Sequence, residues 1–228
     1  MAELLLYCIG DASLAPPDAG HGVWGGGLRR VVHRELAALV SPVAEPARAA
    51  TPSRAELLDY ERVIHSRHDL TDVLPMRFGS LLPHEEAVRA HLDERRAAYL
   101  RALTRIAGCV ELGVRARLSL PHPPTATEDT VAPVSRSGAD YLKARQRRYS
   151  AENRLRDQCT ALEQALLSKV APLCREHRVE LSPPRCSLFF LVPRGQVSAF
   201  RAALTPLPDV GTSEPTLSGP WPPFNFVD

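Results

Sequence analysis

The sequence predicts an α+β protein of two small domains, because stretches typical of strands and helices alternate twice along its 228 residues. The clearest strand covers 109–118, where apolar and polar residues alternate with a period of two. The clearest helix covers 138–170, whose second half repeats apolar residues at near-heptad spacing. We therefore expect two ferredoxin-like α/β sandwiches joined by a helix, each with helices on one face of a small sheet.

The domain limits follow from this alternation. We place an N-terminal α/β domain at 1–107 and a C-terminal ferredoxin-like domain at 108–228. The second contains a linker at 121–137, which is rich in Pro, Thr and Ser and is expected to be exposed and mobile. It ends in a tail at 220–228, whose prolines and aromatic residues predict an extended segment rather than a helix.

The first half should begin with a strand at 4–9, which is apolar almost throughout and is therefore expected to be covered on both faces. A glycine-rich loop at 10–27 follows. Two strand-like segments at 28–32 and 35–40 come next, and the second ends at Ser41-Pro42.

Two helices are expected in this half. The first starts near Thr51-Pro52, where Thr is a reasonable N-cap before Pro, or at Ser53, which has the spacing of a capping box with Glu56, and it runs to about His68. The second follows Pro83 and continues to Ile106, with Gly108 just past its end.

Between these helices, Leu74–Leu82 predicts a strand that turns into a loop. Met76 and Phe78 should face the core, while Arg77 stands on the opposite face. One interpretation is an ordinary core strand with an outward arginine. The other is that Arg77 anchors the strand to a neighbouring helix or domain, or faces a partner, while Phe78 holds the N-terminal core.

The second half contains the long helix, whose first part is basic from Lys143 to Arg156. Cys186–Val192 is the most apolar stretch and predicts a central strand. A short helix at 196–204 and a last strand at 211–219 complete the domain, and we expect no strand between the long helix and Arg185.

Composition narrows the class of protein. Hydrophobic residues make up 44% and charged residues 24%, which is typical of a globular domain. The net charge of +2 is too small to indicate nucleic acid or an anionic membrane as the main partner. Five cysteines without CxxC spacing, and an opening without a secretory pattern, favour reduced thiols in the cytoplasm and no disulfide framework.

No group of residues predicts catalysis. His65 and His68 have the spacing of two helical metal ligands, but a third ligand is missing nearby, so we expect no metal. The glycines at 20–27 lack the spacing of a phosphate-binding loop, and no cofactor is expected. The basic helix is most simply a solvated face, although it could bind nucleic acid or an acidic protein.

The remaining candidates concern structure and interaction. Tyr141 and Arg145 are four residues apart on one helix face, and we expect them to hold that helix against the tail. In the tail, Trp221 and Phe224 should dock on the protein itself, over a sheet edge, or on a partner.

Several segments resemble the gas vesicle protein F/L family (GvpF/GvpL), in the family's order and over nearly the whole chain. The similar segments are the opening strand with Tyr7 and Gly10, Leu39 to Val43, Leu57 to Tyr60, Val73 to Ser80, Gly108 to Val114, Gly138 to Arg145 and Leu217 to Phe224. The combination of Leu-Pro-x-Arg-Phe-Gly, Tyr-Leu-x-x-Arg and Gly-Pro-Trp-Pro-Pro-aromatic is specific. Met76 stands where the family often has valine, and it remains apolar.

The resemblance implies a non-enzymatic accessory or minor structural protein of gas vesicles. Its partners would be the main gas vesicle shell protein and other accessory proteins, and its location the gas vesicle within the cytoplasm. It implies no cofactor, metal, small-molecule substrate, nucleic acid or membrane. The alternative, from the residues alone, is a small-ligand or nucleic-acid binding module of ferredoxin-like type.

Overall fold

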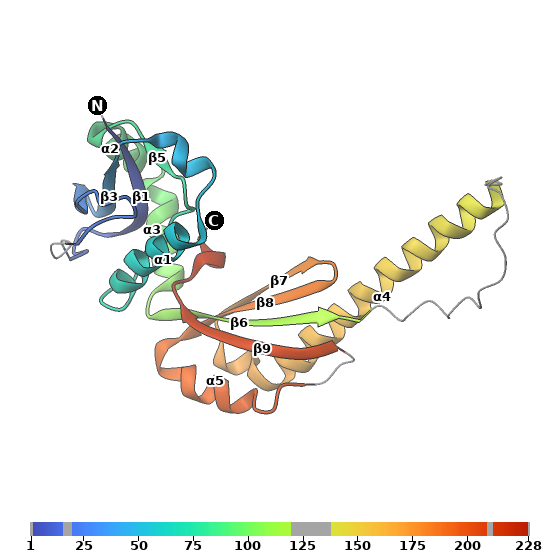
Figure 1. The fold of residues 1–228 in the computed structure, drawn as a ribbon. Helices are drawn as coiled ribbons and strands as arrows, with labels where there is room; N and C mark the ends of the chain where they lie inside the picture. Colours follow the sequence, from blue (N-terminus) through green and yellow to red (C-terminus); the bar gives the residue numbers. More distant parts are fainter. Residues whose placement is uncertain (1, 16–19, 120–137, 209–211, 228) are drawn as a thin grey trace. The chain divides into compact units, whose positions relative to one another are not determined.

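The computed structural model describes residues 2–15, 20–119, 138–208 and 212–227, and shows an α+β chain with two antiparallel sheets (Figure 1). The predicted class is therefore confirmed. The chain forms two compact units, the first made of Met1–Glu111 with Gly219–Asp228 and the second of Leu112–Ser218.

The tail therefore belongs to the first unit, whereas the sequence-based division grouped 220–228 with the second. The physical reason is that Phe226 is fully buried there and Phe224 packs against the core of that unit. The tail is also not wholly extended, because Phe224–Phe226 forms a short 3-10 helix. The predicted linker at 121–137 lies outside the described residues.

The first unit is built on a sheet in which β1 (Glu3–Asp11) is central. Its neighbours are β3 (Leu36–Val43) on one side, followed by β2 (Arg29–His33), and the short strands β4 (Leu74–Pro75) and β5 (Leu81–Leu82) on the other. All four pairings are antiparallel.

Helices cover this sheet on both faces. Consecutive residues of β1 from Leu4 to Gly10 are buried, which requires cover on each side. Tyr60 and Ile64 of α1 (Arg54–His68) pack with Leu5 and Tyr7. The prediction that this strand is covered on both faces is confirmed. The prediction that the helices lie on one face of the sheet is wrong for this unit.

The start of α1 follows the predicted capping box. Ser53 Oγ accepts a hydrogen bond from the backbone N–H of Glu56 at 3.3 Å, and Glu56 Oε2 accepts from the backbone N–H of Ser53 at 2.7 Å. These bonds satisfy backbone donors that a helix start otherwise leaves without partners.

The strand expected to turn into a loop over Leu74–Leu82 is shorter than predicted, and a second strand follows the turn. β4 and β5 both pair with β1, and the residues between them form a turn. Gly79 in this turn has φ +85°, a conformation that disfavours other residues, so the chain leaves the sheet and returns to it.

The single helix expected up to Ile106 is broken. The structure has α2 (Glu85–Glu94) and α3 (Arg96–Ile106), separated by Arg95 with non-helical backbone angles. The break lets the two helices contact different strands, because α2 lies against β2 and β3 while α3 lies against β1 and β4. Gly108 has φ +67°, as expected for a residue that ends a helix.

The second unit has a sheet in the order β7-β8-β6-β9, with β8 in the interior as predicted. Its elements are β6 (Cys109–Leu118), α4 (Gly138–Val170), β7 (Glu176–Ser182), β8 (Arg185–Pro193), α5 (Val197–Ala203) and β9 (Thr212–Trp221). Three further 3-10 helices are η1 (Pro46–Ala50) in the first unit, and η2 (Ala171–Leu173) and η3 (Arg194–Gln196) in the second. Strand β7 was missed from the sequence, although Val179 and Leu181 alternate with charged residues before a Pro-Pro turn.

The core of the second unit lies between α4, α5 and the sheet. Leu155 is the first residue of α4 in this core, and Leu162 and Leu166 continue the same stripe. Phe190 of β8 packs edge to face on Phe200 of α5, with ring centroids 5.2 Å apart.

Candidate interaction surface

Phe78 lies where three segments of the first unit meet. Its ring packs edge to face on Tyr60 of α1 at 5.0 Å and on Trp24 of the glycine-rich loop at 5.9 Å. Tyr60 also donates a hydrogen bond to the carbonyl of Leu6 at 2.8 Å, which fixes α1 on β1. Phe78 thus contributes to the core of this unit, whereas Met76 is half-buried.

Arg77 points outward from the turn between β4 and β5. Its side chain is exposed, and its guanidinium has no ion pair with any residue that the structure describes. Its carbonyl accepts hydrogen bonds from Ser80, from the backbone N–H at 3.2 Å and from Oγ at 2.8 Å. Its proposed roles as an anchor or a contact to a partner stay predictions.

The glycine-rich loop is held by the Tyr7 hydroxyl, which lies 2.9 Å from both Ser41 Oγ and the backbone nitrogen of Val23. A Cβ on Gly22 would lie 2.4 Å from this hydroxyl and from Ser41 Oγ. Gly22 is therefore required for close packing of the loop on the sheet.

Glu56 ties the same loop to the start of α1. Its Oε1 accepts hydrogen bonds from Trp24 Nε1 and from Arg48, both at 2.6 Å, and the Arg48 guanidinium lies over the Trp24 ring. The backbone N–H of Ser53, followed by the Trp24 indole, lowers the pKa of Glu56 to about 2. The carboxylate is thus a fixed acceptor that connects loop, η1 and helix.

The tail is held in the first unit by its polar groups as well as its rings. Both oxygens of the buried Glu111 carboxylate accept hydrogen bonds from Asn225, from the backbone N–H at 2.8 Å and from Nδ2 at 2.7 Å. Arg105 of α3 donates to the carbonyl of Phe226. The expected docking of the tail on the protein itself agrees with these contacts.

Trp221 is the aromatic residue of the tail that stays accessible. Its side chain is 42% exposed and packs edge to face on His65 of α1, with ring centroids 5.7 Å apart. Leu58, at 49% exposure, and Arg62 precede His65 by seven and three residues and lie on the same helix face. We name Leu58, Arg62, His65 and Trp221 the α1–Trp221 surface.

The two candidate residues of the long helix are Tyr141 and Arg145, and the structure describes the side chain of Arg145 alone. Tyr141 is part of α4, but its side chain is not among those that the structure describes. Arg145 is exposed, donates to Tyr149 Oη at 3.2 Å and lies over that ring. Their proposed role in holding α4 against the tail stays a prediction.

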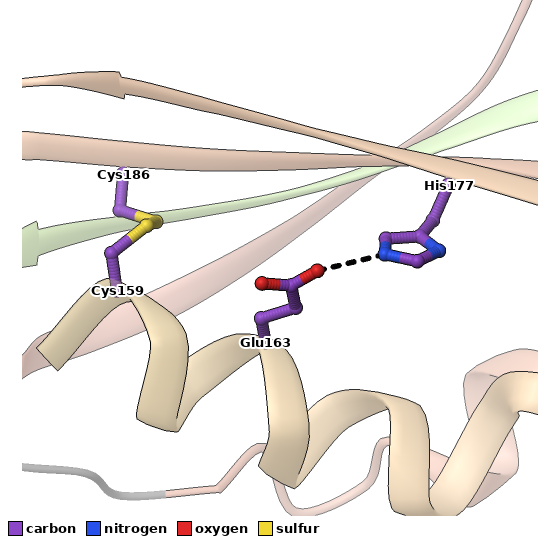
Figure 2. The surroundings of a disulfide bond; sticks show 4 residues. All are labelled: Cys159, Glu163, His177 and Cys186. Atoms are coloured by element: carbon purple, nitrogen blue, oxygen red, sulfur yellow. Dashed lines mark hydrogen bonds and ion pairs between the residues drawn. A yellow bond between two sulfur atoms is a disulfide. The ribbon is translucent and has the colours of Figure 1, made fainter. Parts of the chain in front are cut away.

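The expectation of fully reduced thiols is corrected by a disulfide between Cys159 of α4 and Cys186 of β8 (Figure 2). The two residues are 27 apart in sequence, and only the packing of α4 on the sheet brings them together. One turn along α4, Glu163 binds His177 of β7 at 2.8 Å. Cys8 stays a thiol in the first core, where burial raises its pKa to about 12.

The described parts of the chain contain no group of three or more His, Cys, Asp or Glu arranged to hold a metal ion. His65 contacts Trp221, while His68 is buried in the first unit. Among the same residues, no helix is both long and apolar enough to cross a membrane.

Sequence reasoning missed two features of this surface. The alternation predicted over 109–118 puts Glu111 on the polar face of its strand, and the pairing with Asn225 could not be seen because the two are 114 residues apart. It named Trp221 but not its partner His65 or the exposed Leu58. The helical spacing of Leu58, Arg62 and His65 was the available signal.

The family model described as "Gas vesicle synthesis protein GvpL/GvpF" matches residues 3–228. Gas vesicle protein F from Streptomyces sp. (strain CB03234) is 29% identical over 248 aligned positions, which cover 97% of this chain and 99% of the relative. Gas vesicle protein L from the same strain is 28% identical, covering 92% of this chain and 87% of the relative.

The fold also resembles a solved structure. The crystal structure of the gas vesicle protein GvpF from Anabaena sp. PCC7120 superposes with a TM-score of 0.76 at 18% sequence identity. The match covers 100% of this chain and 97% of that one, so the likeness extends over the whole architecture.

Proposed function

Because this chain belongs to the GvpL/GvpF family of gas vesicle synthesis proteins, we propose that it is a non-enzymatic accessory or minor structural protein of gas vesicles. In this role it binds the main shell protein and other accessory proteins and assists assembly of the vesicle inside the cell. The observation that carries the proposal is the family match over residues 3–228.

The α1–Trp221 surface supplies a physical route for binding the shell protein. Tryptophan is among the residues that contribute most to binding energy in protein interfaces, and Trp221 is held in place by His65 while remaining 42% exposed. Leu58 extends the apolar area along α1. The rest of the tail is fixed by Glu111, so this surface is already ordered before a partner arrives.

The architecture supports a binding role in a second way. In the second unit the element order strand-helix-strand-strand-helix-strand, with sheet order β7-β8-β6-β9, supports a ferredoxin-like sandwich, and we propose this type for that unit alone. Such a domain offers exposed helix faces on a rigid sheet, which suits a protein that positions subunits.

The assembly role is tested by deleting the gene in the organism that carries it and counting gas vesicles by electron microscopy. We expect fewer or no vesicles, with numbers restored by a plasmid copy of the wild-type gene. A deletion strain that forms vesicles of normal number and shape would contradict the assembly role.

A further inference from the structure

The first half of α4 is an unusual part of the second unit, because none of its described side chains lies in a core. The helix has 33 residues, about 50 Å at 1.5 Å per residue, whereas a ten-residue strand such as β6 spans about 33 Å. Among the described side chains of α4, Leu155 is the first that is buried. We call residues 138–154 the α4 arm (Figure 1).

The charge of the arm is strongly one-sided. Within residues 138–154 there are two acidic residues, Asp140 and Glu152, and five basic ones. The basic residues are Lys143, Arg145, Arg147, Arg148 and Arg154, and Arg156 follows just past the arm. The whole chain has a net charge of only +2, so this segment concentrates positive charge that the rest of the protein offsets.

A hollow of about 440 Å³ opens at the base of the arm, lined by Ser119, Arg154, Asp157 and Gln158. Gln158 donates through Nε2 to the carbonyl of Ser119 at 3.1 Å. Its other amide atom, Oε1, is buried and accepts no hydrogen bond from the described residues. A partner chain with a free N–H could therefore donate a hydrogen bond to this oxygen.

We propose that the α4 arm and the hollow at its base form a docking site for an acidic segment of a partner protein. Arginine predominates over lysine in the arm, and its planar guanidinium binds carboxylates in a bidentate manner. The unpartnered Gln158 Oε1 is suited to the N–H of a polypeptide or amide side chain, a donor that a phosphate backbone lacks. This site is separate from the α1–Trp221 surface and does not depend on the proposed function.

The experiment measures binding of a fluorescent oligo-glutamate peptide to the full chain by anisotropy at low and at physiological salt. The test variant is Arg145→Glu/Arg154→Glu. The matched control is Arg54→Glu/Arg101→Glu, which reverses the same charge at two exposed arginines of the first unit. Thermal melting verifies that both variants are folded, which is expected because all four side chains lie on the surface.

We expect the arm variant to bind the peptide roughly tenfold more weakly than the wild type, because two attractive charges become repulsive. The control should bind within about twofold of the wild type, since exposed charges away from the site contribute little. Equal losses in the two variants would overturn the proposal, because they would show only a general charge effect. Tighter binding of a single-stranded RNA of equal charge, lost in the arm variant, would also overturn it and assign the arm to nucleic acid.

Discussion

Glu111 joins the start of β6 to Asn225 of the tail through two hydrogen bonds, at 2.8 Å to the backbone nitrogen and 2.7 Å to Nδ2. The carboxylate is buried, so its oxygens depend on protein donors rather than on water. The pair therefore fixes the segment that carries Trp221.

Replacing Glu111 with glutamine should lower the free energy of unfolding by about 1–3 kcal/mol, because an amide N–H₂ would face the donor Nδ2 of Asn225. Urea denaturation followed by circular dichroism measures this change. Glu94→Gln, at an exposed position of α2, is the control and should change stability by less than about 0.5 kcal/mol. Equal effects of the two substitutions would show that the Glu111–Asn225 pair does not stabilise the fold.

Tyr7→Phe tests the hydroxyl that holds the glycine-rich loop. The substitution leaves the ring on Tyr60 but removes the bonds to Ser41 and to the backbone of Val23. We expect a loss of about 1–2 kcal/mol in the free energy of unfolding. Tyr149→Phe, on an exposed tyrosine of α4, should be close to neutral, and a neutral Tyr7→Phe would contradict this account of the loop.

Gly22→Ala tests the close approach of the loop to the sheet. The new methyl group would meet Tyr7 Oη and Ser41 Oγ at 2.4 Å, so the loop must shift and the protein should lose about 1–3 kcal/mol. Gly27→Ala is the matched control, because no atom lies within 4 Å of a Cβ at that position. Differential scanning fluorimetry compares the two melting temperatures, and a Gly22→Ala protein as stable as the control would refute the packing role.

Glu56 predicts a specific dependence of stability on pH. Its pKa is lowered to about 2, below the value of about 4.3 for an unfolded glutamate, so its ionised form stabilises the folded state. The contribution is fully present above about pH 4.3 and is lost as the pH falls through about 2. The melting temperature of Glu56→Gln should therefore lie below that of the wild type at pH 7, and the gap should narrow in acid. A gap that is constant from pH 7 to pH 2 would exclude this role.

Local signals in the sequence were sufficient for the elements that local interactions determine. The capping box of Ser53 and Glu56 marks the start of α1, and the apolar repeat of α4 predicts its bounds. A strand that turns into a loop was predicted from Leu74, but the second strand, β5, was missed because its pairing with β1 is a tertiary contact. The disulfide between Cys159 and Cys186 was missed for the same reason, since only tertiary packing brings the two thiols together.

The candidate surface was predictable to a smaller extent. Trp221 and Phe224 were recognised as interaction residues from their Pro-rich setting, but the structure separates them, since Phe224 packs on the core and Trp221 stays exposed. Which ring is buried and which is exposed depends on the position of Asn225, which Glu111 holds. The residue pattern within the tail does not reveal this long-range contact.

We propose that this protein binds the main gas vesicle shell protein through the α1–Trp221 surface. The most direct measurement is the amount of shell protein that co-purifies with the tagged chain from cells producing both. We expect retention by the wild type and by Arg101→Glu, and a loss of most of it with Leu58→Ser/Trp221→Ala, whose side chains are exposed and not needed for the core. Shell protein retained by the double variant as well as by the wild type would contradict the proposed surface, and none retained by the wild type above the untagged background would contradict the binding itself.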